Sequence, residues 1–227
     1  MIIIDNVPCK YIKEFPTKIE FILLHKLIDN EGYRNYFLKN KNNDKYKILD
    51  NSCFELGESL NADLLVDWAE KINASEIIIP DCYKNKNKTI ELFDQFVVRD
   101  DIEFFNLMAV PQGKNNEELR RCTEYMMENP KVTCIGFNKL WSRDKFHTIH
   151  RGNKLQHQID VLGATNKLNM HVLGCQDLDD YFLIKNLMGV RSFDTRIMSK
   201  IVCGKNDIWE EELTKEQKTI LKRLIYK

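Results

Sequence analysis

The stretch that decides the fold is residues 46–81, which read YKILDNSCFELGESLNADLLVDWAEKINASEIIIPD. Short apolar runs at residues 46–49 and 76–79 have the length of buried strands. Between them, apolar residues at helical spacing form one face of an amphipathic helix: Leu60, Leu64, Leu65, Trp68 and Ile72. A strand, a helix and a second strand in this order predict a right-handed crossover between parallel strands.

The same alternation continues on both sides of this unit. Apolar runs predict further strands at residues 19–24, 104–110, 132–135 and 170–173, and a weaker run predicts one at 190–193. Helical faces lie between them, at Leu119, Cys122 and Met126, at Leu155, Ile159 and Leu162, and at Leu178, Tyr181, Phe182 and Leu187. No linker interrupts the pattern, and seven to eight such units favour a closed barrel over an open sheet. The sequence has no glycine-rich dinucleotide-binding motif and no P-loop motif, which argues against both of those functions. We therefore predict a single-domain (β/α)8 TIM barrel over residues 1–227.

Composition is that of a globular protein with an adequate core, because 43% of the residues are hydrophobic and 30% are charged. The formal net charge of zero argues against a purely electrostatic nucleic-acid binder, but it does not exclude local basic patches. Seven cysteines without a Cys-x-x-Cys pair indicate a reducing compartment. The sequence has no signal-peptide pattern and no apolar run of ~20 residues, so we expect a cytoplasmic protein, in the host cytoplasm if its source is viral.

Polar residues and glycines stand where six successive predicted strands end, and in a barrel those ends meet at one mouth. They are Asp50, Asp81, Gln112 with Gly113, Gly136, Gly174 and Asp194. Each one alone is explained by a polar loop, and Asp194 before Thr195 also by helix capping. Together they favour an active site. Two carboxylates can support displacement at an anomeric carbon, and a third with a carboxamide can bind the polar edge of a purine.

Short motifs in a fixed order resemble the tRNA-guanine transglycosylases and their DNA-modifying relatives. The segment Asp50-Asn51-Ser52-Cys53-Phe54-Glu55 is similar to the Asp-Ser-Gly-Gly-Phe-Gln segment of that family, and closer to the Asp-Asn-Ser form of the DNA enzymes. The motifs that follow are Ile79-Pro80-Asp81, Val110-Pro111-Gln112-Gly113, Ile135-Gly136-Phe137, His171-Val172-Leu173-Gly174 and Phe193-Asp194-Thr195-Arg196. The resemblance spans about residues 46–200 and is closest to the phage and bacterial branch that inserts 7-deazaguanine bases into DNA.

The resemblance implies a role for each of these residues. Asp194 is the expected nucleophile at the anomeric carbon, and Asp50 is the expected general acid and base. The expected base-binding residues are Asp81, Gln112, Gly113, Gly136 and Gly174. Guanine leaves, a covalent sugar–enzyme ester persists, and a free 7-deazaguanine base of the preQ0 type attacks the ester. The exchange needs neither ATP nor a cofactor.

No metal is expected in this chain. The tRNA enzymes hold a structural zinc with a Cys-x-Cys-x-x-Cys motif and a histidine after the nucleophile, whereas only Cys203 and no histidine follow Asp194 here. His147 and His150 are spaced as metal ligands can be, but no cysteine or carboxylate cluster accompanies them. We assign these histidines to a binding loop.

Three basic segments follow predicted strand ends and are candidates for contact with DNA, although each taken alone also fits a solvated surface. Their residues are Lys84 and Lys86, then Lys139, Trp141, Arg143, Lys145 and Arg151, and finally Arg191 and Arg196. Cations neutralise phosphates and flat rings stack on bases. A duplex hides the glycosidic bond of its guanine, so we expect the loop at residues 141–151 to hold a flipped nucleotide.

The leading interpretation is a DNA guanine transglycosylase, and three alternatives stay open. The first is the same chemistry on tRNA, which the missing zinc motif and the short chain disfavour. The second is a nucleoside or glycoside hydrolase that uses Asp50 and Asp194. The third is a non-catalytic nucleic-acid-binding barrel, for which the basic loop is the whole function.

Overall fold

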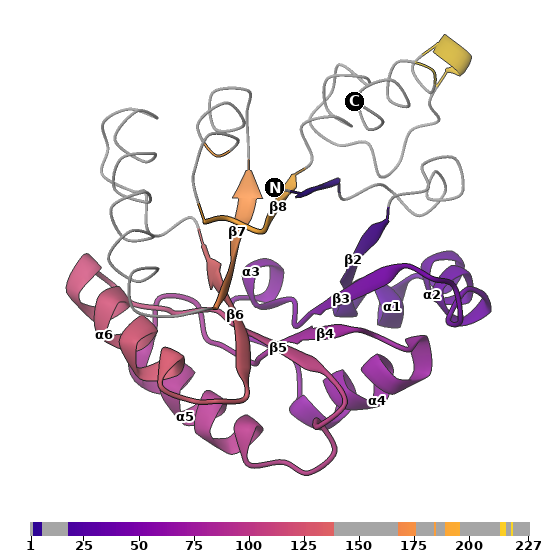
Figure 1. Cartoon of the computed structure of the whole chain (residues 1–227). Helices are drawn as coiled ribbons and strands as arrows, with labels where there is room; N and C mark the ends of the chain where they lie inside the picture. Colours follow the sequence, from indigo (N-terminus) through magenta and orange to yellow (C-terminus); the bar gives the residue numbers. More distant parts are fainter. Residues whose placement is uncertain are drawn as a thin grey trace.

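The sheet forms a nearly closed barrel (Figure 1). The computed structural model describes residues 2–5, 18–138, 168–175, 184, 189–195, 214–216 and 219. Within these ranges eight strands form one sheet in the order β1-β8-β7-β6-β5-β4-β3-β2, and every neighbouring pair is parallel. The terminal strands β1 and β2 also approach each other, which brings the two edges of the sheet together.

The strand bounds confirm the predicted positions with small shifts at the ends. The strands are β1 (Ile2–Asp5), β2 (Ile19–Leu23), β3 (Tyr46–Asp50), β4 (Glu76–Ile78), β5 (Asn106–Ala109), β6 (Val132–Phe137), β7 (Asn169–Cys175) and β8 (Ser192–Thr195). The prediction for β5 began too early, because Phe104 lies in a turn and is 92% exposed. Strand β1 was not predicted, since a four-residue apolar run at a chain end gives too little pattern to separate it from other structures.

Helices connect four successive pairs of strands, and all of them except the short α3, whose residues line the cavity described below, cover the outside of the sheet (Figure 1). They are α1 (Leu24–Asp29), α2 (Glu31–Lys39), α3 (Cys53–Leu56), α4 (Ala62–Ile72), α5 (Lys86–Val97) and α6 (Asn116–Met127). An asparagine side chain caps each of α2, α4, α5 and α6 by accepting a backbone N–H bond. Most residues of the connections after β1, β6 and β7 fall outside the described ranges, so the complete eightfold repeat stays a prediction.

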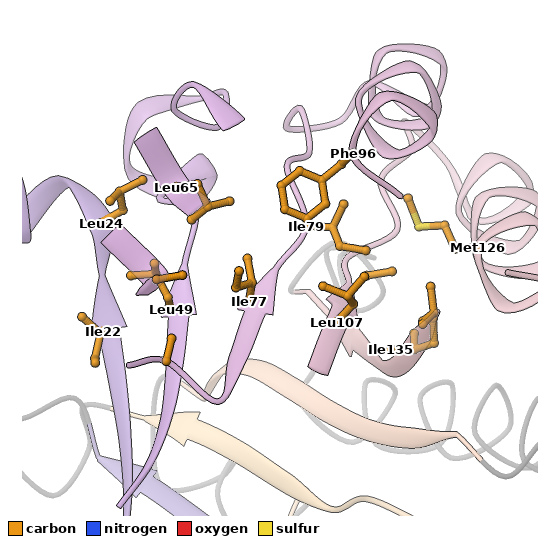
Figure 2. Packing of buried hydrophobic residues seen from close by; sticks show 14 of the residues in the cluster. Ile22, Leu24, Leu49, Leu65, Ile77, Ile79, Phe96, Leu107, Met126 and Ile135 are labelled. Atoms are coloured by element: carbon orange, nitrogen blue, oxygen red, sulfur yellow. The ribbon is translucent and has the colours of Figure 1, made fainter. Parts of the chain in front are cut away.

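Two apolar layers hold this architecture together. The larger lies between the sheet and the helices, where Leu49, Ile77 and Leu107 of the strands pack toward Leu65 of α4 and Met126 of α6 (Figure 2). Leu119, Cys122 and Met126, the predicted face of α6, are all buried. Since alternate strand residues point to opposite sides of a sheet, the remaining strand side chains face the barrel interior.

The interior layer determines where the strand-end residues point. Ile48 of β3, Ile78 of β4 and Met108 of β5 belong to a buried cluster inside the barrel. The residue two positions after Ile48 is Asp50, and it faces the same side, beyond the apolar layer. The polar residues therefore lie above an apolar floor at the carboxyl ends of the strands. In the described part of the chain, no helix has both the length and the apolar character needed to cross a membrane.

Candidate active site

A cavity of about 380 Å³ opens at the carboxyl ends of the strands, a size typical of small-molecule sites. Five of the predicted site residues line it: Asp50, Asp81, Gln112, Gly174 and Asp194. These residues come from five different strands or strand ends and are up to 144 positions apart in the sequence, from 50 to 194. The barrel thus brings the two predicted catalytic carboxylates and the predicted base-binding pair into one cavity.

Asp194 is held against the neighbouring strand. Its side chain is buried, and its Oδ1 accepts a hydrogen bond of 2.9 Å from the backbone N–H of Gly174. The Nε2 of His171 lies 3.3 Å from the same oxygen. Gly174 has a φ of 70°, and the register between β7 and β8 shifts between Val172 and Cys175, so the backbone at Gly174 turns its N–H toward Asp194. This irregularity fixes the orientation of the carboxylate.

Asp50 is the last residue of β3, and its environment favours the protonated acid. Its Oδ1 accepts a hydrogen bond of 2.5 Å from the backbone N–H of Ser52, which stabilises the carboxylate. Burial has the larger effect and raises the pKa of Asp50 well above its usual range, and the nearby charge of Glu55 raises it further. A carboxyl group whose environment favours the protonated form can act as a general acid.

Asp81 sits at the centre of a buried amide network. Its Oδ1 accepts a bond of 2.8 Å from Asn51 Nδ2, and its Oδ2 accepts one from Gln112 Nε2. Burial raises the pKa of Asp81 to about 6, against the opposing effect of these two hydrogen bonds. Gln112 Oε1 in turn accepts the backbone N–H of Lys84 at 3.1 Å. The orientation of both amides is therefore set, and Asp81 is ionised at neutral pH.

Two predicted glycines have packing roles around the cavity. A Cβ at Gly136 would lie 2.9 Å from Val110 Cγ2 and 3.2 Å from Leu173 Cδ1, and both of these side chains line the cavity. A larger residue there would displace the cavity wall. Gly113 is not among the lining residues, and a Cβ there would lie 2.7 Å from the backbone nitrogen of Leu119. Gly113 therefore lets the chain after β5 pack against α6.

Of the residues predicted to contact nucleic acid, the structure describes only Lys84, Lys86 and Arg191. Lys84 follows Asp81, is exposed, and its Nζ lies 5.2 Å from the ring centroid of Tyr83, a residue of the cavity lining. Lys86 is the first residue of α5 and is not among the cavity-lining residues. Another group lies outside the described residues: Lys139, Trp141, Arg143, Lys145, Arg151 and Arg196, together with His147 and His150. Among the residues that the structure describes, no cluster of side chains could hold a metal ion.

Arg191 does not lie where we expected. It precedes β8, at the amino end of the strand, whereas Asp194 lies at the carboxyl end. Its Nη2 forms an ion pair of 3.0 Å with Glu76 Oε2, at the start of β4. Three residues of strand separate positions 191 and 194 by about 10 Å. Proximity in sequence to Asp194 did not predict where the Arg191 side chain lies. We therefore no longer count Arg191 among the residues expected to contact phosphates.

Sequence reasoning missed three residues of the site. Phe54 is 61% exposed at the cavity and packs edge-on against Tyr83, with ring centroids 6.2 Å apart. Asn51 orients Asp81, and His171 contacts Asp194. All three lie inside the motifs that carry the family resemblance. The alternation of side chains along β7 and β8 was the available signal for His171, because it places positions 171 and 194 on the interior side.

No protein-family model matches the chain, and no curated protein matches it. The family assignment therefore stays a proposal based on motifs and on the geometry of the cavity.

Proposed function

We propose that this protein is a DNA guanine transglycosylase, which exchanges guanine in DNA for a 7-deazaguanine derivative of the preQ0 type. The observation that supports this most is the meeting of Asp50, Asp81 and Asp194 in one cavity, each with different hydrogen-bond partners. Base exchange needs a nucleophile, a proton carrier and a purine-binding acceptor. These three carboxylates supply one of each.

In the first half of the reaction, an oxygen of Asp194 attacks C1′ of the target deoxyguanosine. The bond between C1′ and N9 breaks, and its electron pair leaves with guanine. Asp50, whose raised pKa favours the acid, gives its proton to the departing base. The products are free guanine, ionised Asp50 and a covalent ester between Asp194 and the sugar.

In the second half, the 7-deazaguanine occupies the place that guanine has left. Asp50 takes the proton from N9 of the incoming base, and N9 attacks C1′. The bond between C1′ and the Asp194 oxygen breaks, which restores the carboxylate. Asp50 is again protonated, so the cycle consumes no ATP and needs no redox partner.

Base recognition is assigned to Asp81 and Gln112. An ionised carboxylate accepts from the ring N–H and amino group that guanine and 7-deazaguanine share, since each of its oxygens can accept more than one bond. Gln112 and Asn51 hold that carboxylate in place. The exposed ring of Phe54 offers a stacking surface for a flat base at the cavity mouth.

The polymer is proposed to be DNA. Lys84 lies against Tyr83 of the cavity lining, Lys86 follows two positions later at the start of α5, and both can neutralise phosphates next to the target nucleotide. The loop at residues 141–151 keeps its expected role as the element that holds the flipped nucleotide. The choice of DNA over tRNA rests on the Asp-Asn-Ser motif and on the missing zinc-ligand motif.

The test is to incubate the protein and preQ0 with guanine-containing DNA or with tRNA, and to identify the nucleosides by mass spectrometry after digestion. We expect a 7-deazaguanine nucleoside in DNA, with release of one guanine for each base inserted. Incorporation into tRNA alone would identify the tRNA enzyme. Guanine release without incorporation would identify a hydrolase, and salt-dependent DNA binding with no release would identify a non-catalytic binder. The matched control is Asp194→Asn, which keeps the shape of the side chain but lacks the charged nucleophile.

A further inference from the structure

A chain of hydrogen bonds runs from the amino ends of the strands to Asp194. Arg191 Nη2 pairs with Glu76, and Arg191 Nε donates to Ser192 Oγ at 3.2 Å. Ser192 Oγ lies 2.8 Å from His171 Nδ1, and His171 Nε2 lies 3.3 Å from Asp194 Oδ1. Both Ser192 and His171 are fully buried. The hydrogen-bond chain thus connects a partly buried ion pair at one end of the barrel with the proposed nucleophile at the other.

The chemistry of the donor groups determines which group donates and which accepts in each of these hydrogen bonds. A guanidinium can only donate, so Ser192 Oγ accepts from Arg191. The buried hydroxyl of Ser192 then needs an acceptor for its own proton, and His171 Nδ1 lies at the right distance. An imidazole that accepts at Nδ1 is neutral and carries its proton on Nε2. That proton points toward Asp194 Oδ1, where a carboxylate accepts it.

The ring of His171 is also held from the side. It stacks on Phe21 with ring centroids 5.9 Å apart and an interplanar angle of 13°. With both nitrogens and one face in contact, the imidazole cannot turn without breaking buried hydrogen bonds. Asp194 Oδ1 therefore receives two fixed donors, the N–H of Gly174 and the Nε2–H of His171.

We propose that His171 is a positioning residue, which orients the Asp194 carboxylate for attack on C1′, and that Arg191 and Ser192 fix the tautomer that it needs. This inference rests on the proposed function, because it assigns a role within that reaction. A neutral donor orients the carboxylate and leaves it nucleophilic. The same two donors stabilise the carboxylate when the ester breaks in the second half of the reaction.

The tautomer can be measured without any enzymatic activity. The protein has five histidines, so the imidazole signals of His171 in the ¹⁵N-labelled protein can be identified by their loss when His171 is replaced with glutamine. We expect a protonated Nε2 and an unprotonated Nδ1 for His171 at pH 7.5, and loss of this fixed state in Ser192→Ala. A proton on Nδ1, or a doubly protonated ring, in the wild-type protein would overturn the inference.

The kinetic test compares two replacements of His171. His171→Gln keeps an amide donor that can reach Asp194, whereas His171→Leu removes it. We expect the rate of covalent adduct formation with guanine-containing DNA to fall about 100-fold in His171→Leu. We expect it to recover to within about tenfold of wild type in His171→Gln, with affinity for preQ0 unchanged in both variants. Equal rates in His171→Leu and wild type would overturn the inference.

Two controls separate this role from a general loss of packing. Thr123→Val removes another fully buried hydroxyl, which donates to the Leu119 carbonyl in α6 away from the cavity, and it should leave the adduct rate unchanged. Thermal unfolding identifies any variant that fails to fold, and in that case Ser192→Ala provides the comparison, with a slower adduct rate expected. A wild-type protein that shows the predicted tautomer but forms no adduct would contradict the proposed function. A reactive protein with a different tautomer would contradict only this inference.

Discussion

The hydrogen-bond and charge partners of buried carboxylates differ between the two ends of the barrel. At the amino ends of the strands, Glu76 is neutralised by Arg191 and also accepts a 2.9 Å hydrogen bond from the Tyr46 hydroxyl. At the carboxyl ends, the donors to Asp50 and Asp81 are a backbone N–H and two carboxamides. A charged partner stabilises the fold, whereas neutral donors orient a carboxylate and leave its charge or proton for chemistry. The difference separates a structural end from the end at which we propose the chemistry, and these are called the structural end and the functional end below.

The strongest test of the functional end is Asp194→Asn. The amide keeps the volume and can still accept the N–H of Gly174, but it is a poor nucleophile. We expect base exchange to fall by about 10⁴-fold or more, with the free energy of unfolding changed by less than about 1 kcal/mol. Exchange assays and urea unfolding check the two parts. Activity within tenfold of wild type would show that Asp194 does not form the bond to the sugar.

The structural end is tested by Arg191→Met. This change leaves Glu76 buried without its cation, and we expect the free energy of unfolding to fall by about 3 kcal/mol. The double variant Glu76→Gln with Arg191→Met should be more stable than Arg191→Met alone, because it no longer buries the unpaired charge of Glu76. Urea unfolding of the three proteins measures both effects. A loss below about 0.5 kcal/mol in Arg191→Met would contradict a structural role.

The pKa of Asp81 predicts the pH dependence of base binding. Burial raises this pKa to about 6, so the carboxylate is ionised above that pH and becomes protonated as the pH falls below it. Protonation removes an acceptor for the N–H groups of the base, and we expect preQ0 affinity to fall by about tenfold per pH unit below pH 6. Calorimetric titration of the protein with preQ0 at several pH values from 5 to 8 measures this affinity. The affinity of Asp81→Asn should be lower at pH 7.5 and flat across this range, and a flat wild-type profile would contradict the assignment.

Phe54→Ala probes the mouth of the cavity. Because the ring is 61% exposed, its loss should leave stability unchanged, whereas loss of stacking should weaken preQ0 or DNA binding by about tenfold. Phe104→Ala is the matched control, since Phe104 is 92% exposed and is not among the cavity-lining residues. Equal binding by the two variants would remove Phe54 from the site.

The smallest expected effect is that of Lys84→Ala. One lost phosphate contact should reduce DNA affinity by a few-fold and lower the slope of log affinity against log salt by about 1. Lys71→Ala is a suitable control, because Lys71 lies in α4 and pairs with Asp67. Binding measured by fluorescence anisotropy at several salt concentrations checks the prediction. An unchanged slope would place the DNA away from Lys84.

Much of the fold could be predicted from sequence because its signals are local and repeated. Apolar runs predicted β2 to β8, and the alternation of strands with helices predicted that neighbouring strands are parallel. The end of β3 at Asp50 and the placement of Asp81 after β4 followed from the same pattern. Strand β1 (Ile2–Asp5) was missed because its apolar run is too short to separate a strand from other structures.

The contacts within the site could not be predicted in the same way. The pairing of Arg191 with Glu76 joins positions 115 residues apart, and only the closure of the barrel brings them together. Sequence proximity instead suggested that Arg191 lies beside Asp194. The turn of the Gly174 N–H toward Asp194 depends on a register shift between β7 and β8, which leaves no mark in the apolar pattern.

The central claim is that Asp194 forms a covalent bond to the sugar during base exchange. The most direct measurement is mass spectrometry of the denatured protein after incubation with a guanine-containing oligonucleotide without preQ0, followed by peptide mapping. The account predicts a DNA adduct on the peptide that contains Asp194, its disappearance when preQ0 is added, and its absence in Asp194→Asn. A wild-type protein that inserts preQ0 without such an adduct, or that carries the adduct on Asp50, would contradict it.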